Sequence, residues 1–332
     1  MRAWRFHEPG DIRNLVLEEV PDPEVGPDES LVRVETAALN PADRYLVQGQ
    51  YPRAGKPPFT PGRDGAGVVV KPGNSGRFKE GDRVCVLGGL TGISSPGLLA
   101  EYCAVPDAWL APVPDGWTME EAAAGPLTLL TAWRALRVRG ELRSGETVLV
   151  TGASGGVGSA AVMLASGLGA RVLALSRDPA KRNTLVSLGA AVALDAAAPD
   201  IEKQVKSVAP EGISLVVENL GGLWLDRCLR MVAPHGRVMV VGLLAGLTAE
   251  VTIGLLIHKN LRVEGLSVSA YAPEEAGHAW REITDLLAKT GRKPVIDRVF
   301  DFESVQAAFD RLADGPLGKV VIRVGIASVQ IE

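Results

Sequence analysis

Hydrophobic and polar positions follow two different patterns along the chain. Up to about residue 120, short apolar or alternating runs are separated by clusters of Gly, Pro, Asp and Asn, which is typical of strands joined by turns. The predicted strands cover 15–19, 31–39, 67–70, 83–87 and 100–105. We expect these strands to form a β-rich, partly open antiparallel barrel.

From about residue 120 onward, helical segments alternate with short apolar strands. Helices are expected at 120–138, directly after the glycines that follow 147–150, and at 179–188, 199–208 and 223–232. Strands are expected at 147–150, 171–175, 191–194, 215–218, 237–241 and 261–268. This alternation predicts an α/β Rossmann fold, that is, a doubly wound parallel sheet covered by helices.

The last part of the chain breaks this alternation. It has helical patterns at 273–289 and 303–313 and strand patterns at 295–300 and 319–324. A length of 332 residues exceeds what one hydrophobic core usually supports, so two domains are expected. We predict a β-rich domain formed by 1–122 and 268–332, with a nucleotide-binding domain, 123–267, inserted between them.

A glycine-rich turn follows the first strand of the second domain. Glycine lets the backbone turn sharply and approach a pyrophosphate, and the N–H groups of the next helix point at the anion. Such turns also serve as plain connectors, but here a second strand follows at the spacing of a βαβ unit, which favours a dinucleotide site. The predicted pyrophosphate-binding residues are Gly152, Ala153, Ser154, Gly155, Gly156, Val157 and Gly158.

The end of the second strand indicates which dinucleotide binds. NAD sites have an acidic residue there for the ribose 2′-hydroxyl, whereas a 2′-phosphate requires a cation and no acid. This chain has Ser176 and Arg177 at that point, with Lys181 nearby. Asp178 precedes Pro179 and is expected to cap the next helix. NADPH is therefore favoured over NADH, the alternative being that Arg177 and Lys181 are ordinary surface charges.

Composition excludes several classes of function. The net charge is −4, from 35 basic and 39 acidic residues, and no basic cluster suggests a nucleic-acid or membrane partner. The N-terminal sequence lacks the apolar core of a signal peptide, and no apolar run is long enough for a membrane span. The 3 cysteines and 4 histidines are scattered without metal-ligand spacing. We expect a cytoplasmic enzyme without a metal.

Several segments in the right order resemble the medium-chain dehydrogenase/reductase family, and within it the zinc-free, zeta-crystallin-like quinone oxidoreductases. They are 40–52, which begins Asn-Pro-Ala-Asp-Arg-Tyr, 61–68, 81–84, 122–133 and the glycine turn. The resemblance implies a GroES-like first domain and a Rossmann second domain. Zinc-dependent members have a cysteine at the position of Asn40, a histidine at Arg63 and a further cysteine near Gly125 or Pro126. Without these ligands, alcohol dehydrogenase activity through zinc is not expected.

The same resemblance suggests the residues of the active site. It implies that Asn40 and Asp43 stand beside the nicotinamide and the acceptor, and that Tyr45 and Tyr51 line the acceptor pocket. Tyr51 has an ionisable hydroxyl and is the candidate proton donor. Alternatively, its ring only lines the cleft. The alternative role for Asn40 is to cap a turn before Pro41.

Further cofactor contacts follow from the same resemblance and from the ends of the predicted strands. Thr131 follows a family threonine near the nicotinamide, although a buried helix threonine is the plainer interpretation. Asn219, Gly242 and Leu243 follow two central strands, where ligands gather in a doubly wound sheet. Lys319 occupies a position from which the family often sends a cation to the pyrophosphate; its alternative is a solvated side chain at the start of the last strand.

These observations predict hydride transfer from NADPH to a small-molecule acceptor such as a quinone or an enone. An enoyl-thioester reductase is an alternative, because relatives with that activity share the segment ending in Tyr51, and Arg53, Lys56 and Arg63 are candidate cations for a carrier's phosphates. A second alternative is a non-catalytic NADPH-binding protein. The segment 261–269 implies, by resemblance, a homodimer whose sheet continues across a two-fold axis.

Overall fold

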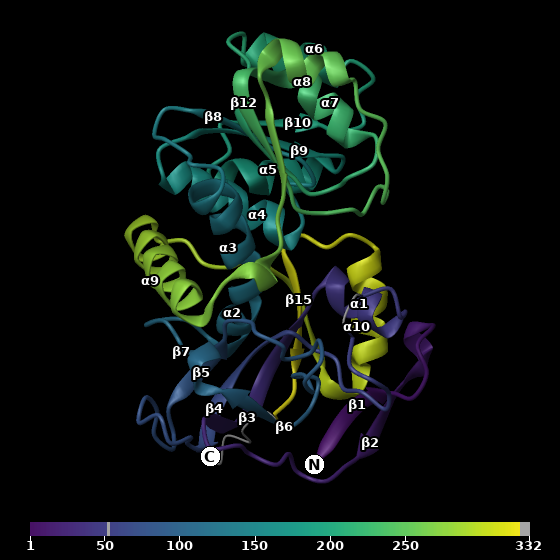
Figure 1. Ribbon diagram of the computed structural model, residues 1–332, viewed down its shortest axis with the longest axis vertical. Helices are drawn as coiled ribbons and strands as arrows, with labels where there is room; N and C mark the ends of the chain where they lie inside the picture. The colour runs from purple at the N-terminus through teal and green to yellow at the C-terminus, as the bar shows by residue number, and fades with distance from the viewer. Residues whose placement is uncertain (52–53, 326–332) are drawn as a thin grey trace. The chain divides into compact units, whose positions relative to one another are not determined.

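The computed structural model describes residues 1–51 and 54–325, and these form two compact units (Figure 1). The first unit comprises Met1–Leu127, Tyr271–Trp280 and the chain from Lys293 onward. The second comprises Thr128–Ala270 and Arg281–Arg292.

The first unit is built on a mainly antiparallel sheet in the order β14-β15-β3-β4-β5-β7, with β6 paired to β3. The strands before residue 120 all pair antiparallel, as predicted, and only β14 and β15, which come from the C-terminal part of the chain, pair in parallel. A separate pair, β1 and β2, completes the strands. Their bounds are β1 Arg2–Phe6, β2 Leu15–Glu19, β3 Glu29–Leu39, β4 Asp64–Lys71, β5 Arg83–Val86, β6 Tyr102–Pro106, β7 Leu110–Pro112, β14 Ile296–Asp301 and β15 Lys319–Arg323.

The core of this unit follows from the alternation in β3. Val32 and Val34 are buried, while Arg33 and Glu35, which alternate with them, are partly exposed and form an ion pair. From Ala37 onward the strand is buried on both faces, where β4 and β15 flank it. The helices and short 3₁₀ turns of the unit are α1 Pro41–Val47, α2 Met119–Ala124, α10 Val305–Ala313, η1 Ile12–Asn14, η2 Asp107–Trp109 and η5 Phe302–Ser304.

The second unit is the predicted doubly wound sheet. All neighbouring strands are parallel, in the order β10-β9-β8-β11-β12-β13, so the strand order reverses between β8 and β11. Ligands bind at such a reversal, beyond the carboxyl ends of the strands. The strands are β8 Thr147–Val150, β9 Arg171–Ser176, β10 Val192–Asp195, β11 Ile213–Glu218, β12 Val232–Val240 and β13 Arg262–Gly265.

The helices of the second unit occupy the crossovers between these strands, as Figure 1 shows. They are α4 Gly156–Gly167, α5 Pro179–Ser187, α6 Ile201–Val208, α7 Trp224–Met231 and α8 Ile253–Lys259. Two helices have residues in both units, α3 Pro126–Trp133 and α9 Pro273–Thr290, and a π-helical turn, Arg134–Val138, follows α3. A 3₁₀ turn, η4, covers Val268–Ala270.

The division into units differs from the predicted domain limits in three segments: 123–127 belong to the first unit, 268–270 belong to the second, and the third segment is the longest. Residues Arg281–Arg292 were expected with the β-rich domain but belong to the second unit. The reason is packing against α4: a Cβ on Gly167 would lie 3.3 Å from the side chain of Leu286, and Arg292 donates a hydrogen bond of 3.0 Å to the carbonyl of Met163.

Among the described residues, no helix is both long and apolar enough to cross a membrane.

Candidate active site

The turn after β8 has the geometry of a pyrophosphate cradle. Gly152 adopts a φ of 54°, a left-handed conformation that favours glycine. A Cβ on Gly158 would lie 2.3 Å from the carbonyl oxygen of Gly152, so only glycine lets α4 pack this closely on the turn. Gly155 differs, because a Cβ there would meet only that carbonyl, at 3.5 Å, and would otherwise stand in open space. This open side, together with the N-terminus of α4, fits a pyrophosphate.

The end of β9 carries the residues expected to read the adenosine ribose. Ser176 is buried, with its hydroxyl 3.5 Å from that of Ser154, while Arg177 is exposed. Asp178 accepts hydrogen bonds from the backbone N–H groups of Ala180 and Lys181, which confirms the predicted helix cap. Its carboxylate also lies 3.9 Å from the Lys181 ammonium. Asp178 is therefore committed to α5.

A buried hydrogen-bond network joins the ends of β8 and β11. The Thr151 hydroxyl donates to Glu218 Oε1 at 3.0 Å and accepts from the backbone N–H of Asn219 at 2.9 Å. Glu218 also accepts from the N–H groups of Leu220 and Gly221, and burial raises the pKa of its carboxyl. Glu218 and Thr151 were not predicted from the sequence; the available signal was an acidic residue at the end of a mostly apolar central strand.

Asn219 is oriented by this network. Its Nδ2 donates to the carbonyl of Thr151 at 2.8 Å, and its Oδ1 has no hydrogen-bond partner within the part of the chain that the structure describes. The residue is 8% exposed, so a buried acceptor without a donor among the described residues lies at the reversal of strand order. This is the environment in which a bound dinucleotide is expected.

The other residues of the second unit that were predicted to contact the cofactor are Gly242, Leu243 and Thr131. A Cβ on Gly242 would lie 2.0 Å from the carbonyl oxygen of Asn219, so glycine is required where the ends of β11 and β12 approach. Leu243 is 43% exposed, and Thr131 is buried in α3.

In the first unit, Asn40 stands between a carboxylate and an ammonium. Its Nδ2 donates to Asp64 Oδ2 at 3.0 Å, and its Oδ1 accepts from Lys319 Nζ at 2.6 Å. Asn40 precedes α1, as the turn-capping alternative supposed, and its backbone N–H donates to Asp43 at 2.8 Å. Its side chain, however, is engaged by Asp64 and Lys319, so capping is not its only role.

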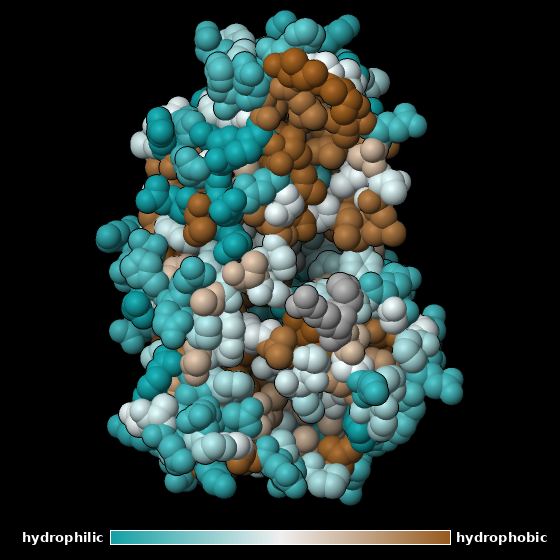
Figure 2. Space-filling view, viewed as in Figure 1, coloured by the Kyte–Doolittle hydropathy of each residue, from teal (hydrophilic) through white to brown (hydrophobic). Residues whose placement is uncertain are grey.

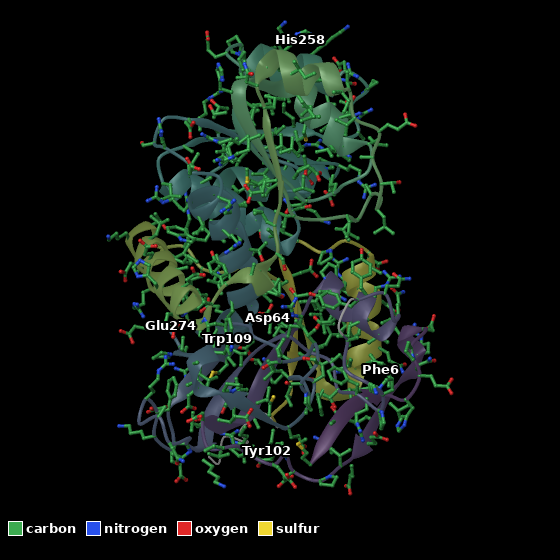
Figure 3. All side chains as sticks on the ribbon, in the orientation of Figure 1. Phe6, Asp64, Tyr102, Trp109, His258 and Glu274 are labelled. Atoms are coloured by element: carbon green, nitrogen blue, oxygen red, sulfur yellow. The ribbon has the colours of Figure 1, made fainter. Side chains whose placement is uncertain are left out.

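The ion pair that holds Asn40 is itself buried. Lys319 Nζ lies 2.9 Å from Asp64 Oδ2, and the two side chains are 4% and 1% exposed. Asp64, labelled in Figure 3 among the strands of the first unit, also accepts from the backbone N–H of Leu127 at 3.0 Å. The alternative of a solvated Lys319 is therefore wrong, because the ammonium needs Asp64 and Asn40 as partners inside the protein.

Asp43 is the most perturbed acid of this cluster. It is fully buried, and burial raises its pKa to about 6, against the opposing attraction of Arg63 and Lys319. One carboxylate oxygen accepts from Asn40, whereas Oδ1 has no hydrogen-bond partner among residues 1–51 and 54–325. A carboxyl that titrates near neutrality beside two cations is a common feature of functional sites.

Tyr51 is paired with Arg63. The Arg63 Nη1 donates to the Tyr51 hydroxyl oxygen at 3.2 Å, and the guanidinium carbon lies 5.8 Å from the centre of the ring. Arg63, one of the three candidate cations for a carrier's phosphates, is buried and is engaged by Tyr51. Of its two suggested companions, Lys56 is exposed and Arg53 lies outside the described residues. Tyr45 is half-buried on α1.

The residue types in this cluster do not suit a transition metal. Asn40, Arg63 and Lys319 offer no thiolate or imidazole, the ligands that zinc prefers. Within the described ranges, no group of three or more His, Cys, Asp or Glu side chains is arranged to hold an ion.

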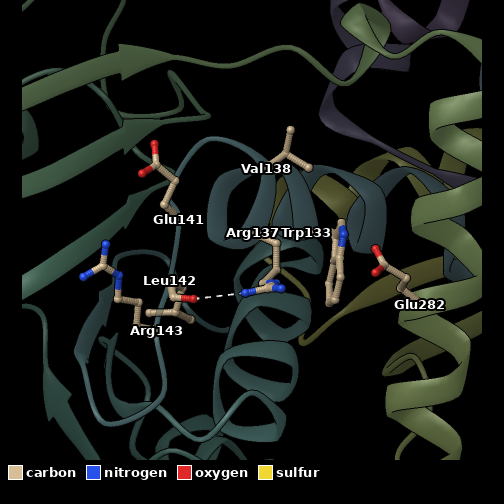
Figure 4. A pocket seen from close by; sticks show the side chains of 7 residues that line it. All are labelled: Trp133, Arg137, Val138, Glu141, Leu142, Arg143 and Glu282. Atoms are coloured by element: carbon tan, nitrogen blue, oxygen red, sulfur yellow. Dashed lines mark hydrogen bonds between the residues drawn. The ribbon is translucent and has the colours of Figure 1, made fainter.

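The second unit also has a pocket of about 420 Å³, shown in Figure 4. Its walls come from the end of α3, the turn after it and Glu282 of α9, and Arg137 donates to the carbonyl of Leu142 across it. None of the predicted site residues lines this pocket. The candidate residues therefore lie in two places, at the strand ends of the second unit and in the buried cluster of the first unit.

A doubly wound sheet with a dinucleotide turn, in a chain whose first unit carries a buried cluster of polar groups, is typical of nicotinamide-binding oxidoreductases. Two family models match the chain: the alcohol dehydrogenase GroES-like domain at residues 26–115 and the zinc-binding dehydrogenase domain at residues 156–289. The chain belongs to the medium-chain dehydrogenase/reductase family, as the resemblance implied.

Individual relatives agree with this assignment. Quinone oxidoreductase-like protein 2 of Bos taurus is 35% identical over 303 residues, which is 90% of this chain and 85% of the relative. A solved NAD-dependent alcohol dehydrogenase has a TM-score of 0.89 and 29% identity, covering 98% of this chain and 100% of that one. A mycobacterial protein solved in complex with NADPH has a TM-score of 0.88 and 27% identity, with coverages of 98% and 100%.

Proposed function

We propose that this oxidoreductase transfers a hydride from NADPH to a quinone or a similarly activated carbonyl or alkene, without zinc. The observation that carries the proposal is the buried cluster of Asn40, Asp64 and Lys319. Within this cluster, Asn40 occupies the position where zinc-dependent members have a cysteine, and its amide is held by Asp64 and Lys319 instead of binding a metal. An acceptor whose reduced form delocalises its own negative charge does not require a metal to polarise it.

The proposed division of labour follows from the contacts of each residue. Bound NADPH supplies the hydride. The turn from Gly152 to Gly158 holds the pyrophosphate, and Asn219 Oδ1 accepts a hydrogen bond from the cofactor. Asn40, fixed on both sides of its amide, orients the acceptor, and Tyr51 donates the proton to the oxyanion that hydride transfer produces.

The preference for NADPH rests on the end of β9. Ser176 and Arg177 stand where an NAD-binding protein has an acid, and the acid that comes next, Asp178, is occupied as a helix cap. Arg177 makes no hydrogen bond or ion pair through its guanidinium within 1–51 and 54–325, which leaves it available to a 2′-phosphate.

Two alternatives remain. Reduction of a 2-enoyl thioester would use the same Tyr51 as proton donor, but Arg63 is buried against Tyr51, which weakens the case for a surface groove that binds a carrier. A non-catalytic NADPH-binding protein would not need the buried cluster of Asn40, Asp64 and Lys319, because desolvating an ion pair is costly.

The test is NADPH oxidation by the purified, EDTA-treated protein. Acceptors are 1,2- and 1,4-quinones and a crotonyl thioester, and each assay is repeated with NADH. Quinone turnover that survives EDTA and is faster with NADPH supports the proposal. Thioester turnover that Tyr51→Phe abolishes moves the assignment to the enoyl reductases, and tight NADPH binding without turnover on any acceptor refutes hydride transfer to these classes.

We also propose that the protein is a cytoplasmic homodimer. The edge strand β13 pairs only with β12 among the described residues, and Val263 on it is 39% exposed. Figure 2 shows apolar surface gathered over the part of the second unit where α7 and α8 lie. The exposed apolar side chains of this region are Leu223, Leu243, Leu244, Leu247, Ile253 and Ile257.

Pairing of β13 with its copy would extend the sheet across a two-fold axis and cover this apolar surface. Sedimentation equilibrium of the wild type and of Val263→Asp tests this. A dimer that the substitution dissociates supports the proposal, whereas a wild-type monomer at micromolar concentration contradicts it.

A further inference from the structure

We propose that the ion pair between Arg182 and Asp195 determines how strongly the protein prefers a 2′-phosphorylated nucleotide. This inference rests on the proposed use of NADPH and adds a specificity-determining pair to it. The decisive observation is the register of β9 and β10, in which Asp195 lies directly opposite Ser176. The end of β9 has no acid of its own, but the neighbouring strand places one beside it.

Asp195 is a potential counterpart of the acid that NAD-binding proteins use. An exposed carboxylate at this edge would repel a 2′-phosphate and would accept a hydrogen bond from a 2′-hydroxyl. Its side chain is 42% exposed, and its Oδ1 accepts from the backbone N–H of Ala197 at 2.9 Å. Without a neighbouring cation, Asp195 would therefore weaken the preference for a 2′-phosphorylated nucleotide, which Ser176 and Arg177 favour.

Arg182 on α5 neutralises this carboxylate. Its Nη1 lies 3.5 Å from Asp195 Oδ1, and its side chain is 21% exposed. The same nitrogen donates to the carbonyl oxygens of Ser176 and Arg177, at 3.0 and 3.1 Å. One guanidinium thus balances the acid on β10 and fixes the backbone at the end of β9.

The result is a local charge balance with one cation in excess. Arg182 and Asp195 cancel, and Arg177 keeps a guanidinium that makes no hydrogen bond or ion pair in the described part of the chain. A dianionic phosphate next to the ribose then meets a net positive charge. Removing only the charge of Arg182 would restore the influence of Asp195.

The experiment measures equilibrium binding without turnover, by calorimetry with adenosine 2′,5′-bisphosphate and with 5′-AMP, which lacks the 2′-phosphate. The proteins are the wild type, Arg182→Gln, Asp195→Asn and Arg182→Gln/Asp195→Asn. Asparagine keeps the acceptor for Ala197. The matched control is Arg230→Gln, which breaks the Arg230–Asp226 ion pair on α7.

We expect Arg182→Gln to weaken binding of the bisphosphate about tenfold and to leave 5′-AMP within about twofold of the wild type. The double variant recovers most of the loss because the opposing acid is gone. Asp195→Asn alone binds the bisphosphate at least as tightly as the wild type, and Arg230→Gln changes neither ligand. Raising the salt concentration shrinks the effect of Arg182→Gln, as for any charge interaction near the surface.

Two outcomes overturn the inference. If Arg182→Gln weakens both nucleotides equally, Arg182 only supports the backbone, and if the double variant does not recover, Asp195 is not the opposing charge. A wild type that binds 5′-AMP as tightly as the bisphosphate refutes the proposed NADPH preference instead. The inference about Arg182 and Asp195 is judged from a different quantity, namely the change in the ratio of the two affinities between each variant and the wild type.

Discussion

Lys319 Nζ lies 2.6 Å from Asn40 Oδ1, although the two residues are 279 positions apart in the chain. The same ammonium contacts Asp64, which in turn accepts from the Nδ2 of Asn40. Because the oxygen of the amide faces a cation and the nitrogen faces a carboxylate, the amide of Asn40 has only one favourable orientation.

Removal of the Lys319 charge should destabilise the protein strongly. Lys319→Met leaves Asp64 buried without its cation, and breaking a buried pair in this way costs about 3–5 kcal/mol. Urea denaturation of the variant measures the loss. Lys319→Met/Asp64→Asn should recover a large part of it, since no buried charge is then left unpaired; a double variant as unstable as the single one would contradict this account.

The pair of Arg63 and Tyr51 predicts a coupling in catalysis. Arg63 donates to the oxygen that would carry negative charge after Tyr51 gives up its proton. Tyr51→Phe should lower kcat on an enone by about 10²–10⁴-fold, as loss of a general acid does. Arg63→Gln should lower it about tenfold when Tyr51 is present and hardly at all in Tyr51→Phe.

This double-mutant cycle has a clear opposing outcome. An equal effect of Arg63→Gln in both backgrounds would mean that Arg63 acts elsewhere, for instance on Asp43. Circular dichroism of all four proteins checks that each is folded.

The pKa of Asp43 predicts a pH-dependent stability. Burial raises it from 3.8 to about 6, so the folded protein holds this proton more tightly than the unfolded chain does. The bound proton on Asp43 therefore stabilises the folded protein. This stabilisation is fully present below pH 3.8 and is lost as the pH rises through 6. The free energy of unfolding of Asp43→Asn should not include this loss, so between pH 4 and pH 7 it should rise by about 2–3 kcal/mol relative to that of the wild type.

Free energies of unfolding of both proteins across this pH range give the difference directly. A constant offset from the altered hydrogen bond to Asn40 does not affect the comparison. A difference that stays flat with pH would show that Asp43 titrates at its ordinary value.

Two glycines of the dinucleotide turn should respond differently to alanine. At Gly158 the added Cβ would meet backbone atoms of Gly152 and Ala153 within 3 Å, so Gly158→Ala should cost about 1–3 kcal/mol of stability. At Gly155 the Cβ has space and φ is −74°, so stability should change little. Gly155→Ala should nevertheless weaken NADPH binding, because the methyl group stands where the pyrophosphate approaches.

Thermal denaturation and calorimetric titration with NADPH separate the two effects. Unchanged NADPH affinity in Gly155→Ala would place the pyrophosphate elsewhere.

The sheet of the second unit could be predicted from the sequence because its signals are local. Apolar runs mark β8 and β9, the glycines mark the turn between β8 and α4, and Asp178-Pro179 marks the start of α5. Each signal lies within a few residues of the element that it predicts. The strand β1 and the helix α1 were missed because both are short, and Arg2 of β1 has its partner, Glu101, far away in the sequence.

The buried charges could not be predicted in this way. Lysine and arginine are usually exposed, and nothing adjacent to Lys319 or Arg63 in the sequence indicates burial. Their environment depends on Asp64 and Tyr51, which only the folded sheet brings near. The same holds for Glu218, whose partner Thr151 is 67 residues away. The identities of Asn40, Asp43 and Tyr51 came from resemblance, and their contacts required the structure.

The position of β15 has a consequence for biosynthesis. This strand lies between β14 and β3, so the central sheet of the first unit stays incomplete until the chain has been synthesised through Arg323. The residues of the second unit end at Arg292 and leave the ribosome earlier. During that interval the carboxylate of Asp64 has no lysine to neutralise it, and a nascent chain that stops before Lys319 lacks the ammonium that completes the buried cluster.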